Sequence, residues 1–226
     1  MKLFKSNTNP RKAHIRDNWF STPLGNILLN VCTEEFDTSV IPITEAYYLS
    51  NGGYVLCWYT DAIDAELMIT PYNPPFPEDM KVDGCYAAVW RIRGKVKEIS
   101  CRFISIWGKE YTWTEVGPES GEDLESQAWE NSKLKISLGT QDGEVLIARS
   151  KKNELMSTTY DKSIDSYSIV EYFDKGLTVP VNNIRINELC QVHFVVAWAK
   201  KVQYDTSTWY AVDALTSALL AAGEVW

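Results

Sequence analysis

The stretch LCQVHFVVAWAKKVQY, residues 189–204, indicates how this chain folds. Its even-numbered positions form an apolar set that only Lys200 interrupts: Cys190, Val192, Phe194, Val196, Trp198, Val202 and Tyr204. Successive side chains of a β-strand point to opposite faces, so this period of two predicts an extended strand with one face in the core. The same parity turns Cys190 inward and His193 to the opposite face.

Three other stretches predict β-hairpins. Residues 46–60 place Asn51-Gly52 between two aromatic and aliphatic runs, and this dipeptide supplies the positive φ angles of a tight turn. Residues 85–108 form two β-rich runs on either side of Gly94. Residues 133–149 alternate polar and apolar side chains, turn through GTQDG and return as EVLIA. We therefore expect a sheet built mainly from antiparallel hairpins.

Helix signals are fewer. Ser120 can cap a short helix that continues to Trp129, with Leu124 and Ala128 on one side. Residues 205–222 repeat apolar side chains at helical spacing before Gly223. Residues 61–69 fit either a helical turn or another strand. The expected fold class is α+β: predominantly antiparallel β-sheet, with a short middle helix and an amphipathic C-terminal helix.

The chain is expected to form a single α+β domain over residues 1–226. Its 226 residues are 45% hydrophobic and 12% aromatic, which is enough to build a core without disulfides or a structural metal. The proline-rich loop at 71–84 is the one candidate for a weak domain boundary, and too few residues precede it to require a second domain.

Charge and cysteine content bear on partners and compartment. Lys and Arg number 22 against 30 Asp and Glu, a net charge of −8, which argues against nucleic acid as the main partner. An acidic surface speeds encounters with basic partners, although it also serves plain solubility. We find no secretory or membrane-spanning apolar run, and the five cysteines form no CxxC pair. We therefore expect a cytoplasmic protein with buried, reduced thiols and no membrane partner.

Signatures of metal, cofactor or nucleophilic chemistry are weak. The only histidines, His14 and His193, lack zinc-site spacing, and DAIDAE at 61–66 lacks the spacing of a calcium loop. Phosphate-binding glycine motifs do not occur. Cys190 and His193 are three residues apart, and in a strand this odd separation places them on opposite faces. We therefore name no catalytic residue, metal or cofactor.

The acidic and aromatic stretch KEYTWTEVGPES, residues 109–120, is the strongest candidate for a binding surface. Aromatic side chains beyond a strand end, next to glycine and proline, often anchor interfaces, although core or lid packing explains them as well. The candidate partner-binding set combines this stretch with two acids near residue 61: Tyr111, Trp113, Glu110, Glu115, Asp61 and Asp64.

A basic stripe is the second candidate. Arg91, Arg93, Lys95 and Lys97 share one parity, so along a strand their charges would line one face. Such a stripe suits an acidic or phosphate-bearing ligand, and it also fits a strand edge protected against pairing with another chain. We favour the edge.

Three functional hypotheses follow. The first is a non-catalytic protein-binding module, such as an inhibitor or immunity-type protein, that captures another, basic protein through an acidic, aromatic-rich surface. The second is a carboxylate-dependent hydrolase or carbohydrate-directed enzyme. The third is a structural or assembly protein of a viral or secretion particle, joined through sheet edges.

Overall fold

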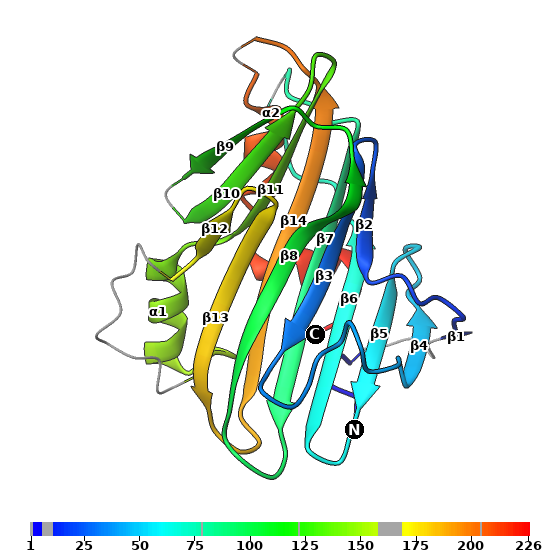
Figure 1. Cartoon of the computed structure of the whole chain (residues 1–226), viewed down its shortest axis with the longest axis vertical. Helices are drawn as coiled ribbons and strands as arrows, with labels where there is room; N and C mark the ends of the chain where they lie inside the picture. The colour runs from blue at the N-terminus through cyan, green and yellow to red at the C-terminus, as the bar shows by residue number, and fades with distance from the viewer. Residues whose placement is uncertain (1, 6–10, 78, 122, 158–168, 204) are drawn as a thin grey trace.

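Two antiparallel β-sheets pack face to face in the computed structural model, which describes residues 2–5, 11–77, 79–121, 123–157, 169–203 and 205–226 (Figure 1). In spatial order, the nine-stranded sheet contains β1 (Arg11–Lys12), β4 (Glu45–Tyr48), β5 (Tyr54–Tyr59), β6 (Ile63–Pro71), β7 (Gly84–Gly94), β14 (Leu189–Lys200), β11 (Leu134–Gln141), β10 (Leu124–Glu130) and β9 (Glu115–Ser120). The five-stranded sheet contains β12 (Glu171–Phe173), β13 (Gly176–Ile184), β8 (Ile99–Tyr111), β3 (Gly25–Cys32) and β2 (Trp19–Thr22).

The main core lies between the two sheets. It includes Trp58 and Trp90 from the nine-stranded sheet and Phe103 from the five-stranded sheet, all fully buried. The predicted parity is confirmed within β14, since Cys190, Val192, Phe194 and Val196 all face this core. The predicted stretch is too long at its end, because β14 stops at Lys200 and Val202 is exposed; Tyr204 lies outside the described residues. Apolar alternation in the sequence therefore identifies the inner face of the central strand correctly.

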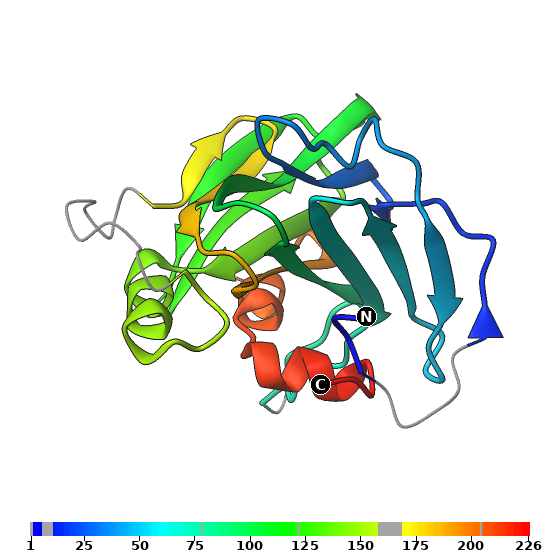
Figure 2. The same ribbon diagram turned by 90° about the horizontal axis from the view of Figure 1, so that it is seen from below.

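A second core covers the opposite face of the nine-stranded sheet. The helices α2 (Ser207–Val212) and α3 (Thr216–Ala222) pack across it, together with the N-terminal segment around Phe4 (Figure 2). Because both faces of the sheet are covered, its central strands are almost wholly buried, and β6 reads as a nearly continuous buried run.

The α+β class with mainly antiparallel sheet is confirmed, and so is the hairpin at 46–60. Gly52 has φ +88°, and the Asn51 side chain accepts a hydrogen bond from the Gly53 amide at 3.0 Å. Residues 61–69 belong to strand β6 rather than to a helical turn. Within the described ranges, none of the helices has both the length and the hydrophobicity to cross a lipid bilayer.

The hairpin predicted at 85–108 is wrong. β7 and β8 do follow each other around Gly94, but β7 pairs with β6 and β14 while β8 pairs with β3 and β13. The connection therefore passes from one sheet to the other. Local sequence marks the reversal of direction, but the choice of pairing partner depends on long-range contacts.

The positions of the helices also differ from the prediction. The stretch expected to form the short middle helix is β10, which pairs with β9 and β11 on its two sides. The middle helix is instead α1 (Gly143–Lys152), formed by residues expected to return as a strand. Asp142 caps it by accepting a hydrogen bond from the Val145 amide at 2.7 Å. The single C-terminal helix is divided into α2 and α3.

Candidate functional site

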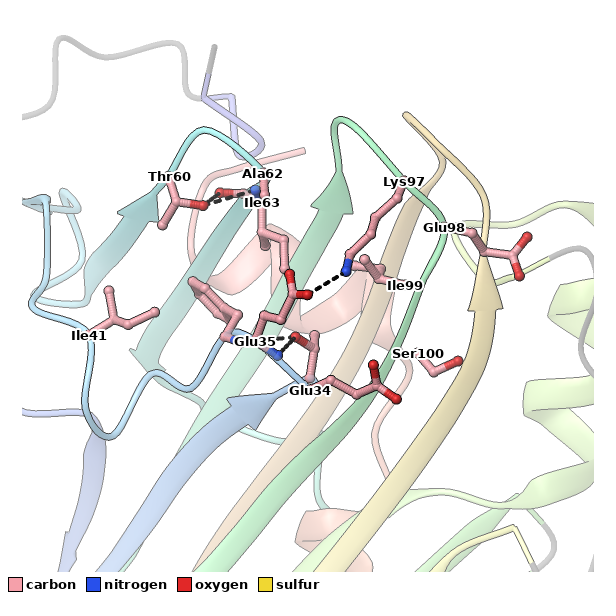
Figure 3. A pocket seen from close by; sticks show the side chains of 12 residues that line it. Glu34, Glu35, Ile41, Thr60, Ala62, Ile63, Lys97, Glu98, Ile99 and Ser100 are labelled. Atoms are coloured by element: carbon pink, nitrogen blue, oxygen red, sulfur yellow. Dashed lines mark hydrogen bonds and ion pairs between the residues drawn. The ribbon is translucent and has the colours of Figure 1, made fainter.

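A pocket of about 340 Å³ opens at one end of the sandwich, where three connections meet. The segment after β3 contributes residues 33–36, the β5–β6 turn contributes Thr60 and Ala62, and the β7–β8 loop contributes Lys97 and Glu98 (Figure 3). The pocket therefore lies between loops that the two sheets hold in place, a common position for binding sites.

The floor of this pocket is apolar and its rim is acidic. Phe36, Ile63 and Ile99 are buried beneath it. Glu34, Glu35 and Glu98 line it and are exposed. Lys97 reaches across to Glu35, with Nζ 2.8 Å from Oε1 (Figure 3). Both side chains are at least half exposed, so this ion pair contributes little to stability and can exchange partners.

The two predicted acids near this pocket have different roles. Asp61 is exposed between the lining residues Thr60 and Ala62. Asp64 is buried and lies 2.6 Å from Arg93 and 3.0 Å from Lys95. Burial alone would raise the pKa of Asp64, but the hydrogen bonds from Arg93 and Lys95 outweigh burial and lower that pKa. Asp64 is therefore a structural carboxylate, and Asp61 is free to face a partner.

The aromatic half of the predicted binding set lies at the other end of the sandwich. Ile99 lines the pocket at the start of β8, and Tyr111 ends the same 13-residue strand, a separation of about 40 Å along its length. The structure thus does not bring Tyr111 and Trp113 together with Asp61 and Asp64.

At that far end, Tyr111 and Trp113 stack on each other with ring centroids 4.5 Å apart and planes inclined by 11°. Both side chains are half-buried and pack against the main core. Glu110 and Glu115 are exposed beside them, and Glu115 lies 3.9 Å from Lys201. The cluster thus combines core packing with a partly accessible aromatic surface.

The basic stripe is divided by its surroundings. β7 lies between β6 and β14, so the interpretation of the stripe as a guarded sheet edge is wrong. Arg91 is buried, Arg93 and Lys95 bind Asp64, and Lys97 lies beyond the strand end on Glu35. The β6–β7 register places Asp64 opposite Arg93 and Glu66 opposite Arg91. The stripe is therefore not a single exposed basic face.

Glu66 is a buried carboxylate to which the sequence analysis assigned no structural role. It accepts hydrogen bonds from the amides of Leu3 at 2.8 Å and Phe4 at 2.7 Å, and also from the Tyr59 hydroxyl. Its cross-strand neighbour Arg91 donates to the carbonyls of Leu3 at 2.8 Å and Trp226 at 3.0 Å. A charged residue within an otherwise apolar strand, as in AELMI, was the available signal for this contact.

The candidate nucleophile and base have unfavourable environments. Burial raises the pKa of Cys190 to about 12, so its thiol stays protonated at neutral pH. Burial, with a smaller contribution from Arg149, lowers the pKa of His193 to about 3. His193 is covered by α3 rather than exposed at the surface, and the five cysteines are free thiols, four of them buried.

Comparison with known proteins gives little guidance. No family model matches the chain, and no curated protein matches it. A solved structure described as a kojibiose phosphorylase from the human microbiome aligns with 87% of this chain at a TM-score of 0.45 and 8% sequence identity. The chain covers 24% of that protein. A likeness of this degree says nothing about activity.

Proposed function

We propose that this chain is a non-catalytic protein-binding module, of the inhibitor or immunity type, that captures a basic segment of another protein in its acidic end pocket. The observation that supports this function is the combination of an apolar floor with a rim of three glutamates, Glu34, Glu35 and Glu98, against one lysine, Lys97.

A lysine or arginine side chain suits this combination. Such side chains place an aliphatic stem on apolar surface and keep the charged head near water or an acid. The floor of Phe36, Ile63 and Ile99 would receive the stem, and the rim carboxylates would receive the head. Three carboxylates against one ammonium group leave an excess of two negative charges around the pocket.

The exposed rim defines how binding should depend on salt. Charges at an interface rim mainly accelerate association and are screened by ions, whereas the buried apolar contact is not. Binding through this pocket should therefore weaken with salt without being abolished. Asp61, next to the pocket, would extend the acidic surface toward the partner.

Fluorescence anisotropy with a labelled hexalysine peptide tests the pocket. The double variant E34K/E98K should weaken binding by about tenfold or more, because two attractive charges become repulsive. The matched control E110K/E115K makes the same charge change at the far end of the sandwich and should leave the pocket intact. An equal loss of hexalysine affinity in both variants would mean that overall charge, and not the pocket, accounts for binding. A loss of affinity in the control alone would place the binding site at the aromatic end.

A second peptide tests the apolar floor. A hexamer of diaminobutyric acid, used at mildly acidic pH where its amines are protonated, carries the same charge as hexalysine on a stem that is two methylene groups shorter. If the floor contributes, the wild-type protein should bind hexalysine more tightly than this peptide at high salt. Equal affinity for the two peptides would contradict insertion of the stem.

A further inference from the structure

A second pocket, of about 460 Å³, lies beside β1 and β4 and is lined by basic side chains. Lys2, Lys12, His14 and Arg16 all line it, and Glu45 is the acidic residue among its lining. The whole chain carries a net charge of −8, so this local accumulation of positive charge runs against the overall balance.

None of these four basic side chains forms an ion pair with another described residue, although Lys2 lies within electrostatic reach of buried Glu66. The ion pairs found there use Arg93, Lys95, Lys97, Arg102, Lys135 and Lys201. The same protein therefore neutralises basic groups elsewhere and leaves those at this pocket unpaired. Unpaired cations that converge on one concavity raise the local concentration of anions.

The backbone explains why three of them share a face. β1 pairs with β4, and the Ala13 amide donates to the Ala46 carbonyl at 2.8 Å, which holds the chain extended. Ala13 and Ile15 pack against the main core. In an extended chain the alternate residues Lys12, His14 and Arg16 then face outward, about 6.6 Å apart from one to the next.

Lys2 reaches the same pocket from the N-terminal segment. Glu66 anchors that segment through the amides of Leu3 and Phe4. The Lys2 ammonium lies 3.9 Å from the centroid of the Tyr47 ring on β4. The buried carboxylate thus fixes where a fourth basic side chain is presented, and the site is assembled from segments that converge only in the folded chain.

We propose that this pocket binds a phosphoryl group, either as free inorganic phosphate or pyrophosphate or as part of a small phosphorylated molecule. Lysine and arginine are the preferred side chains for phosphate oxygens, with Lys as a point charge and Arg as a planar fork. Glu45 on β4 reduces the positive charge of this pocket without cancelling it, since Lys2, Lys12 and Arg16 all line the same concavity. This site is separate from the acidic pocket, and binding here does not depend on the function proposed for that pocket.

Isothermal titration with pyrophosphate at constant ionic strength tests the proposal. The variant K12S/R16S should weaken pyrophosphate binding about tenfold or more. The control R11S/K151S removes the same charge from Arg11, which is outside the pocket lining, and from Lys151 on α1, and it should bind as the wild type does. Equal weakening in both variants, or no saturable binding by the wild type, would overturn the site.

Two further measurements locate the ligand and identify its source. Chemical shifts of the backbone amides at residues 12–16 and 44–47 should change on titration, and shifts confined elsewhere would contradict the assignment. Sulfate, inorganic phosphate and a sugar phosphate, compared by the same titration, separate a free anion from a phosphorylated ligand. If a short oligonucleotide bound well while all these small phosphates did not, the small-ligand proposal would be wrong.

Discussion

Cys190 and His193 stand three positions apart on β14 and point to opposite faces of the nine-stranded sheet. The Cys190 sulfur lies 3.8 Å from the sulfur of Met156 in the main core, while His193 Nδ1 lies 2.8 Å from the Thr216 hydroxyl beneath α3. The backbone of the sheet separates the two groups. A thiol and an imidazole adjacent in sequence therefore do not form a nucleophile and base pair here.

His193 should make the protein sensitive to acid. The unfolded chain protonates this histidine near its ordinary pKa of 6.5, but the folded chain does so only near 3. Between these values the unfolded state holds more protons, so the free energy of unfolding falls as the pH falls. We expect a loss of about 2 kcal/mol between about pH 7.5 and pH 5 from this residue.

Urea unfolding of the wild type and H193Q at several pH values checks this expectation. H193Q loses the titrating group, so its free energy of unfolding should vary less over the same pH range. Glu66, whose pKa is raised by burial, titrates in both proteins and cancels in the comparison. Parallel pH profiles for the two proteins would show that His193 is not responsible.

Glu66 should be needed to hold the N-terminal segment. E66Q replaces one acceptor oxygen with an amide that opposes backbone donors, and it leaves buried Arg91 without its neighbouring negative charge. We expect a loss of about 3 kcal/mol in the free energy of unfolding and faster tryptic cleavage after Lys5. E45Q, an exposed change on β4, which is separated from β6 by β5, should stay within about 0.5 kcal/mol of the wild type. Equal stability of E66Q and E45Q would refute the anchoring role.

Glycine should be required at position 52 only because the turn needs a positive φ there, and not because a side chain would lack space. An added Cβ would meet no atom within 4 Å, yet φ is +88°. G52A should therefore cost about 1 kcal/mol through strain in the left-handed region, as thermal or urea unfolding would show. An added Cβ at Gly117 likewise meets no atom within 4 Å, but Gly117 has no positive φ, so G117A should be close to neutral. If G52A left the free energy of unfolding unchanged, the backbone of the turn would have to shift to a conformation that alanine adopts without strain.

Trp113 should contribute to stability through its packing, whether or not it also contacts a partner. W113A removes the stack on Tyr111 and part of the wall beside Trp107, and should lower the free energy of unfolding by about 2 kcal/mol. The Trp113 indole N–H is buried without a hydrogen-bond partner among the described residues, so W113F should be tolerated better. Hexalysine affinity measured on the same variants separates packing from binding, because W113F should bind as the wild type does under the pocket proposal.

Much of the sheet could be read from local patterns. The alternation in β14, the Asn51-Gly52 turn and the β-rich runs that became β7 and β8 all follow from side-chain period and turn chemistry. The residues around Ser120 and at 144–148 were misassigned because capping and alternation signals there are short. Pairing of β10 with strands on both sides outweighed the helix signal, and the Asp142 cap outweighed the strand signal.

The candidate sites were less accessible to sequence reasoning. Glu34, Glu35 and Glu98 meet at one pocket only because the β3, β5–β6 and β7–β8 connections end at the same edge of the sandwich. Lys2 and Arg16 likewise share a pocket because Glu66 ties down the N-terminal segment. The sequence shows the charges but not which of them are neighbours.

What the sequence determined by itself is the class of structure and, in the clearly alternating strand β14, which side chains face the core, since both depend on periods of a few residues. The tertiary structure alone decided which strands share a sheet, that Arg91 and Arg93 lie on a central strand opposite Glu66 and Asp64, and where uncompensated charge remains. Those outcomes depend on contacts between segments far apart in the chain, whose free energies no local window of sequence contains.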